Sequence, residues 1–162
     1  AISDVSVANY NGPGQIVITG KKESVEEASK KLQEAGAKRV VPLNVSGPFH
    51  SAMLEEAGEK LADVLEKVTI SELQIPYVTN VTAEFVKEQQ KIRSLLAKQI
   101  SSPVKWQQSV EAMIAEGVDT FIEIGPGKTL AGFMRKINRN AKVYNVQTVA
   151  DIEKVVQECS RK

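Results

Sequence analysis

The only histidine of the chain, His50, is the residue best suited to proton chemistry. It lies in the segment 46–51, which joins a predicted strand at 39–43 to a predicted helix at 51–68. Loops that leave strands carry the reactive groups of many α/β proteins. Histidine exchanges a proton near neutral pH, so His50 is a candidate general base, with a purely structural histidine as the alternative. The positive end of the following helix, which we expect to be capped, favours a neutral imidazole.

A nucleophile to pair with His50 is missing from the sequence. No serine or cysteine lies in the Gly-x-Ser-x-Gly turn that presents a nucleophile at the end of a strand. Cys159 has Glu158 beside it near the end of the chain, and an acidic neighbour disfavours a thiolate. We therefore expect this chain to hold one half of an active site.

Composition and charge exclude several classes of protein. The 162 residues are 42% hydrophobic, and 21 Lys and Arg against 20 Asp and Glu give a net charge of +1. This length can bury the core of one domain or parts of two. The balanced charge favours neither nucleic acid nor a membrane surface, and no apolar run approaches a membrane span. The chain opens without signal-peptide features, and one cysteine fits a reducing, cytoplasmic location.

Strands and helices are predicted in near alternation. A capping box at 24–27 is expected to begin the first helix, and Gly36 to end it. The strand at 120–124 is expected to be buried. The predicted strands are 5–10, 15–20, 39–43, 76–80, 120–124 and 142–146, and the predicted helices are 24–35, 51–68, 86–99, 105–115, 129–137 and 150–159.

The order of these elements predicts an α/β protein, and the sequence begins partway through that fold. Residues 5–43 read β-β-α-β, which is the back half of a ferredoxin-like β-α-β-β-α-β unit. The alternation after His50 favours a mostly parallel α/β sheet. Because the chain begins inside the first motif, we expect it to be a fragment of a longer protein.

Two glycine-rich segments invite a functional interpretation. Residues 125–129 look like the end of a phosphate-binding loop, but that motif needs a glycine where this chain has Ile122. Pro126 also lacks an amide donor that a phosphate would use. A tight turn from strand to helix is the favoured interpretation. The segment 11–14 is typical of a hairpin turn.

Four motifs occur in a characteristic order, and together they resemble the malonyl-CoA:acyl carrier protein transacylase family. The resemblance covers nearly the whole chain. It implies an α/β-hydrolase-like domain with an inserted ferredoxin-like subdomain. On that map, residues 1–46 are the back half of the subdomain and residues 47–162 are the C-terminal part of the larger domain. The motifs are the segments 9–20, 47–51, 102–106 and 123–127.

The resemblance implies a ping-pong transfer through an acyl-serine. His50 matches the histidine that serves the serine, and Gln99 matches the residue whose backbone carbonyl orients the imidazole. A helix-surface glutamine is the alternative for Gln99. Asn9 and Asn11 match asparagines that border the cleft between the two domains. Phe49 matches a position where phenylalanine accompanies malonyl rather than the bulkier methylmalonyl, because its ring fills space.

The resemblance also implies what this chain does not supply. The serine, the arginine that grips the malonyl carboxylate and the oxyanion-hole loop would all precede Ala1. Residues 1–162 alone are therefore expected to be inactive. The expected partners are the missing N-terminal half, malonyl-CoA as substrate and acyl carrier protein, with no cofactor and no metal. Candidate contacts for the acidic carrier protein, or else a solvated helix face, are Lys128, Arg135, Lys136 and Arg139.

Two other functions remain as alternatives. The first is a non-catalytic fragment that binds acyl carrier protein or a ligand. The second is a ferredoxin-like domain that binds nucleic acid. The second is disfavoured because such sheets present aromatic residues, and Tyr10 is the lone aromatic residue among the first forty.

Overall fold

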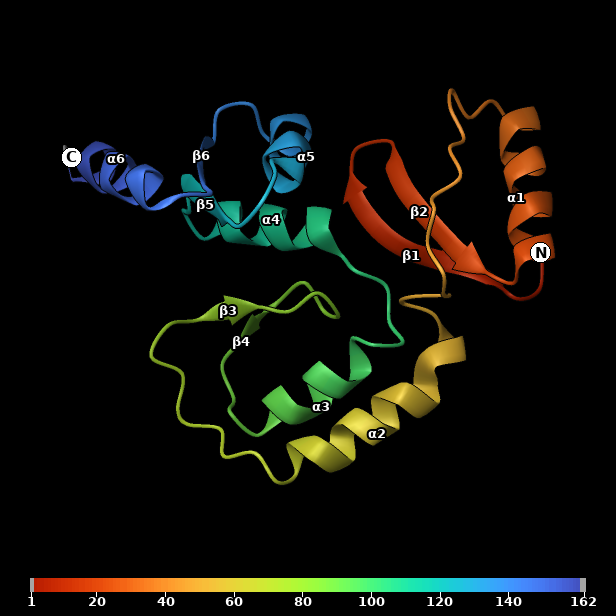
Figure 1. Ribbon diagram of the computed structural model, residues 1–162, viewed down its shortest axis with the longest axis horizontal. Coiled ribbons are helices and arrows are strands. Elements are labelled where there is room, and N and C mark those ends of the chain that lie inside the picture. The colour runs from red at the N-terminus through yellow and green to blue at the C-terminus, as the bar shows by residue number, and fades with distance from the viewer. Residues whose placement is uncertain (1, 161–162) are drawn as a thin grey trace.

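A β-hairpin opens the structure, a computed structural model that describes residues 2–160. β1 (Val5–Gly12) pairs antiparallel with β2 (Gln15–Gly20), and α1 (Lys22–Glu34) contacts both strands (Figure 1). Gly14 in the connecting turn has a φ of 69°, a left-handed value that glycine adopts without strain. The predicted hairpin is confirmed.

The predicted start of α1 is wrong by two residues. The helix begins after Lys21, which makes no side-chain capping bond, so the capping box predicted at 24–27 is not formed. The start is fixed instead by the preceding hairpin. The Lys21 amide donates to the carbonyl of Asp4 at 3.0 Å, and the Lys21 ammonium lies 3.0 Å from the Asp4 carboxylate. The helix ends as predicted, with Gly36 at a φ of 93°.

The strand predicted at 39–43 is also wrong. This segment has no regular structure, and its apolar side chains are open to solvent, with Val41 52% and Leu43 57% exposed. A strand requires the main chain of a neighbour, and no strand within residues 2–160 pairs with it. The described part of the first motif is therefore β-β-α followed by an irregular connector to His50.

Two packed helices follow His50. The segment predicted as one helix is a 3-10 turn, η1 (Ala52–Leu54), followed by α2 (Glu55–Leu65), which packs against α3 (Lys91–Lys98) (Figure 1). The helix predicted at 86–99 begins five residues later than expected. The reason is that β4 (Phe85–Val86) pairs antiparallel with β3 (Tyr77–Val78), which keeps this stretch extended.

The C-terminal part alternates helices and strands. Its elements are α4 (Trp106–Ala115), β5 (Thr120–Ile124), α5 (Thr129–Ile137), β6 (Lys142–Val146) and α6 (Val149–Cys159). β5 and β6 pair in parallel, from Thr120 opposite Lys142 to Ile124 opposite Val146. The bounds predicted for β5, α5 and β6 are confirmed. The expectation of a buried β5 is wrong, since Ile122 is 45% and Ile124 79% exposed.

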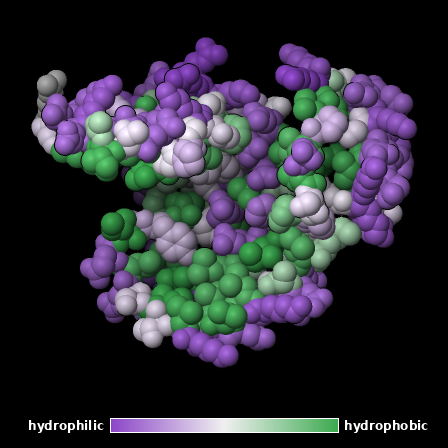
Figure 2. All heavy atoms as spheres, viewed as in Figure 1, coloured by the Kyte–Doolittle hydropathy of each residue, from purple (hydrophilic) through white to green (hydrophobic). Residues whose placement is uncertain are grey.

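The sheets are small, and the core is divided among them. Residues 2–160 form three two-stranded sheets, of which one is parallel, so the predicted mostly parallel sheet is not formed by these residues alone. Val110 of α4 and Met134 of α5 are fully buried where these helices meet. Figure 2 shows a broad apolar surface over the part built from α2 and α3, and a hollow between it and the part that carries α4 to α6. Among the described residues, no helix has the length and apolarity needed to cross a membrane.

Candidate functional site

The backbone of His50 adopts a left-handed conformation, with a φ of 59°. Such a conformation costs about 1–3 kcal/mol for a residue with a Cβ atom, and it persists only where the surroundings hold it. The buried Ser51 hydroxyl donates a hydrogen bond of 2.7 Å to the carbonyl oxygen of Pro48, and so closes the turn around His50. The expected cap of the following helix is wrong, because Ser51 makes no side-chain capping bond to η1.

The imidazole of His50 is oriented by a main-chain group. Its Nδ1 atom lies 3.1 Å from the carbonyl oxygen of Gln99. Gln99 is the C-cap of α3, and the last carbonyls of a helix have no partner within the helix. A carbonyl can only accept, so Nδ1 carries a proton, and in the neutral imidazole Nε2 is then the acceptor. The two residues that the sequence analysis singled out as a pair are therefore in contact. Their catalytic role stays a prediction.

The position of Gln99 depends on how α3 is held. A Cβ atom on Gly58 of α2 would lie only 3.0 Å from the Ala97 carbonyl oxygen, so the two helices approach closely just before Gln99. Arg93 donates from Nε to the carbonyl of Leu65 at 2.9 Å, and from Nη2 to that of Val68 at 2.7 Å. These contacts fix the end of α2 against the first turn of α3.

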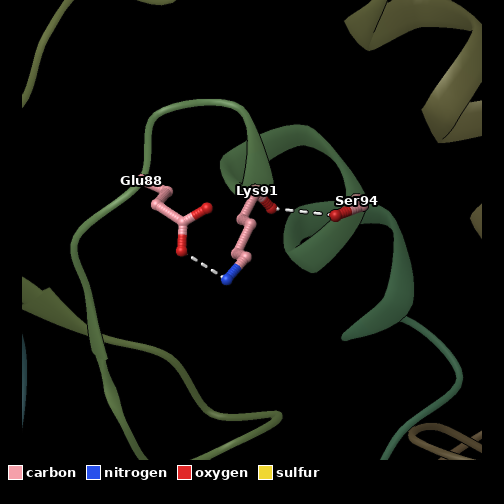
Figure 3. Close-up of polar contacts among 3 residues, drawn as sticks. All are labelled: Glu88, Lys91 and Ser94. Carbon is pink, nitrogen blue, oxygen red and sulfur yellow. Dashed lines mark hydrogen bonds and ion pairs between the residues drawn. The ribbon is translucent and has the colours of Figure 1, made fainter.

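The beginning of α3 is held by side chains of its own first turn. Figure 3 shows the Lys91 ammonium paired with the carboxylate of Glu88, which lies just before the helix. It also shows Ser94, whose hydroxyl donates to the Lys91 carbonyl at 2.9 Å. Both contacts lie at the end of the helix away from Gln99, so they do not reach the site.

Asn9 and Asn11 lie on β1, half-buried and two residues apart. The register of β1 shifts on either side of this segment, between Val7 and Asn9 and again between Tyr10 and Gly12. Such irregularities redirect side chains locally. The same strand is joined to the segment that follows Gln99. The Tyr10 amide donates to the carbonyl of Val104, and the Val104 amide donates to the carbonyl of Ala8, each at 2.8 Å.

Phe49 precedes His50 and is 53% exposed. Its ring lies beside Gly47, where a Cβ atom would stand 3.6 Å from the ring carbons. The aromatic ring therefore stands on the surface next to the histidine rather than in a core.

A carboxylate of the chain itself occupies the N-terminus of α5, just after the glycine-rich turn. Glu123 accepts hydrogen bonds from the Leu130 amide at 3.0 Å and the Ala131 amide at 2.9 Å, and Asn145 donates to it at 2.7 Å. An anion at this helix N-terminus would need the same amides. The interpretation as a strand-to-helix turn is confirmed, and the sequence analysis missed Glu123. The signal was a single acidic residue between two isoleucines of a mostly apolar strand.

The Glu123 carboxyl has a perturbed pKa. Its partial burial raises the pKa, but the hydrogen bonds that the carboxylate accepts, with that from the Ala131 amide foremost, outweigh burial and hold the pKa below its usual value. A negative charge at the N-terminus of α5 also interacts favourably with the helix dipole. Glu123 therefore acts as an anchor between β5 and α5.

The remaining predicted residues lie on the surface. Lys136 donates to the Gln15 side chain at 2.8 Å, which joins α5 to the hairpin, while Lys128, Arg135 and Arg139 are exposed. Cys159 is a free, exposed thiol on α6. Within residues 2–160, no group of three His, Cys, Asp or Glu side chains is placed to hold a metal ion.

Comparison with known proteins gives the family. Residues 1–158 match the acyl transferase domain family. The malonyl CoA-acyl carrier protein transacylase of Bacillus subtilis (strain 168) is 47% identical over 153 residues, which are 94% of this chain and 48% of that protein. The crystal structure of MCAT from Streptococcus pneumoniae superposes with a TM-score of 0.91 at 43% identity, covering 96% of this chain and 51% of the other.

A further solved structure holds a type II PKS acyl-carrier protein in complex with its malonyl-transacylase. It matches with a TM-score of 0.91 at 39% identity, covering 95% of this chain and 50% of that one. This chain belongs to the acyl transferase domain family. It has a mixed α/β fold and spans about half the length of the curated relatives it matches.

Proposed function

We propose that this chain is the C-terminal half of a malonyl-CoA:acyl carrier protein transacylase of fatty acid synthesis. The observation that carries the proposal is the contact of 3.1 Å between His50 Nδ1 and the Gln99 carbonyl oxygen. In the neutral imidazole this contact places the proton on Nδ1 and leaves Nε2 as the acceptor, as a general base requires. The alternative, a non-catalytic binding fragment, gives no reason for an oriented imidazole on a strained turn.

The proposed reaction has two halves, with His50 carrying the proton in each. In the first half, Nε2 takes the proton of a serine hydroxyl while the serine oxygen attacks the malonyl thioester carbonyl. The carbon–sulfur bond then breaks, and Nε2 gives the proton to the leaving sulfur of coenzyme A. In the second, Nε2 takes the proton of the carrier-protein thiol, whose sulfur attacks the acyl-serine. The serine oxygen leaves with that proton. The thioester is already activated, so no metal or cofactor enters.

The serine and the carboxylate-binding arginine would come from the other half of the enzyme. Relatives twice as long as this chain support that assignment. So do apolar side chains that stand in solvent on β5 and in the connector before His50, among them Ile124 at 79% and Val45 at 62% exposure. A folded enzyme covers such residues. We assign residues 1–46 to a partial ferredoxin-like subdomain and residues 47–162 to the α/β-hydrolase-like domain. The single cysteine supports a cytoplasmic location.

Asn9, Asn11 and Phe49 are the proposed substrate-binding residues of this half. The two main-chain hydrogen bonds between β1 and Val104 support a role for the asparagines, because they tie the asparagine strand to the segment after Gln99. The exposed Phe49 ring beside His50 supports a role in selecting the acyl group. An aromatic ring there would occupy the space that a branched acyl chain needs.

Intact-mass spectrometry tests the proposal directly. The full-length enzyme and residues 1–162 alone are incubated with malonyl-CoA and then with carrier protein that bears phosphopantetheine. We expect a malonyl adduct on the full-length enzyme that the carrier protein removes, and no adduct on residues 1–162. His50→Ala slows adduct formation by about 10²–10⁴-fold. Cys159→Ala serves as the control, since an exposed thiol could be acylated without enzyme catalysis. An adduct on residues 1–162 alone that persists in Cys159→Ala would contradict the proposal.

A further inference from the structure

We propose that Ser51 is a positioning residue for the catalytic base, which rests on the role proposed for His50. The hydroxyl of Ser51 donates to the Pro48 carbonyl oxygen at 2.7 Å, across the turn that contains His50. The side chain that follows the histidine thus closes the loop that presents it.

The turn needs such a bond because of the conformation of His50. With a φ of 59°, His50 adopts a backbone conformation that suits glycine or asparagine. In a glycine-free turn of this kind, the histidine would relax toward negative φ unless the flanking residues were held together. The Ser51 hydroxyl supplies the donor that the main-chain amide supplies in an ordinary hydrogen-bonded turn.

The hydroxyl has no competing structural task. Ser51 occupies the N-cap position of η1, where a serine oxygen usually accepts from a helix amide, yet no side-chain capping bond forms. The residue is only 4% exposed, so bulk water has little access to the hydroxyl. The one hydrogen bond observed for this hydroxyl is therefore directed back at the His50 turn rather than forward into the helix.

Two contacts then fix the histidine from its two ends. The Ser51 bond holds the backbone turn, and the Gln99 carbonyl holds the ring at Nδ1. A ring with both its backbone and Nδ1 fixed presents Nε2 in one direction. If the turn loosens, the bond to Gln99 is made only part of the time and both tautomers become populated.

Steady-state kinetics of the full-length enzyme distinguish a role of Ser51 in positioning His50 from a role in folding alone. Loss of one such bond in Ser51→Ala is expected to lower kcat about five- to tenfold while KM for malonyl-CoA changes less than about twofold. Ser51→Cys keeps a weak donor of similar size and should fall between Ser51→Ala and the natural enzyme. Ser109→Ala is the matched control. Ser109 of α4 is 3% exposed, and its hydroxyl donates at 2.8 Å to the carbonyl of Lys105, the N-cap residue of α4.

Of the two alanine variants, only Ser51→Ala is expected to lower kcat, while both lose similar stability. Equal kcat values in the two alanine variants would overturn the proposal, as would a Ser51→Cys variant no better than Ser51→Ala. If the natural enzyme transferred no malonyl group, the proposed function would fail instead, and the following measurement would still test Ser51.

Nitrogen NMR of enzyme with isotope-labelled histidine reports the tautomer of the His50 ring directly. The measurement does not depend on enzyme activity. The His50 signals are assigned by difference against His50→Gln. We expect a single tautomer protonated at Nδ1 in the natural enzyme and in Ser109→Ala, and a mixture of tautomers in Ser51→Ala. A His50 spectrum that is the same with and without the Ser51 hydroxyl would show that this hydroxyl does not orient the ring.

Discussion

Replacing Glu123 by glutamine should weaken the hydrogen bonds that join β5 to the start of α5. The carboxylate accepts from the Leu130 and Ala131 amides with different oxygens, at 3.0 and 2.9 Å, and Asn145 shares the second oxygen. Glutamine offers one oxygen and one NH2 group, so one of the two amides faces a donor. The surviving bond also loses its charge, and with it the favourable interaction with the helix N-terminus.

The expected loss is about 1–2 kcal/mol at neutral pH. A charge-assisted hydrogen bond contributes about 1.5–3 kcal/mol and a neutral one about 0.5–1.5 kcal/mol, and partial exposure of the Glu123 side chain reduces the difference. The pKa of Glu123 is lowered on folding, so its contribution is complete above the unfolded pKa and is lost as the pH falls through the folded pKa. The two proteins should therefore differ at pH 7 and become alike once the natural carboxyl is protonated.

Amide hydrogen exchange in the full-length enzyme measures this locally. The Leu130 and Ala131 amides should exchange about 5–30-fold faster in Glu123→Gln at pH 7. Glu153→Gln removes the same charge from an exposed position on α6 and is the control. Unchanged exchange at Leu130 and Ala131, or an acceleration that persists in acid beyond protonation of the carboxyl, would refute the capping role of Glu123.

Four further substitutions test other parts of the structure. Gln99→Ala should leave the malonyl transfer rate within about twofold of the natural rate, because the group that contacts His50 is a main-chain carbonyl; a loss beyond about tenfold would implicate the side chain. Gly20→Ala should lower the free energy of unfolding by about 3 kcal/mol or more and depress the thermal midpoint, since the new Cβ would stand 2.0 Å from the Asp4 carbonyl oxygen. Gly132→Ala, in the interior of α5 with no atom within 4 Å of the new Cβ, should instead stabilise by about 0.5–1 kcal/mol. Phe49→Ser should narrow the preference for malonyl- over methylmalonyl-CoA in competition assays; an unchanged ratio would remove Phe49 from the specificity site.

The elements predicted best are those whose limits are set locally. β5, α5 and β6 have the predicted bounds because glycine-rich or polar turns separate short apolar runs. The elements predicted wrongly depend on partners distant in the chain. Residues 39–43 have strand-like composition but no neighbouring strand among residues 2–160, and the start of α3 is delayed by the pairing of β3 with β4.

In the site, too, a feature set locally was predicted from the residues themselves, whereas a contact with a distant partner was not. His50 was identified from its residue type and its place in the chain, whereas its partner lies 49 residues away and no spacing rule connects the two. The resemblance to a family, rather than periodicity, pointed to Gln99. Ser51 and Glu123 were missed because their roles rest on the direction in which a hydroxyl or carboxylate hydrogen-bonds, which sequence does not specify. The catalytic and substrate-binding roles of the predicted residues stay predictions.

The pairing between β1 and Val104 has a mechanical consequence. The two hydrogen bonds of 2.8 Å there, and a third of 3.0 Å from the Lys105 amide to the Asn80 carbonyl, make residues 104 and 105 a junction of three chain segments. α4 starts directly after this junction. The hairpin that carries Asn9 and Asn11 therefore cannot swing away from α4 unless two main-chain hydrogen bonds break together. Separation of the hairpin from the start of α4 is therefore opposed by both bonds, whereas motion of side chains and loops beside the asparagines breaks neither of them.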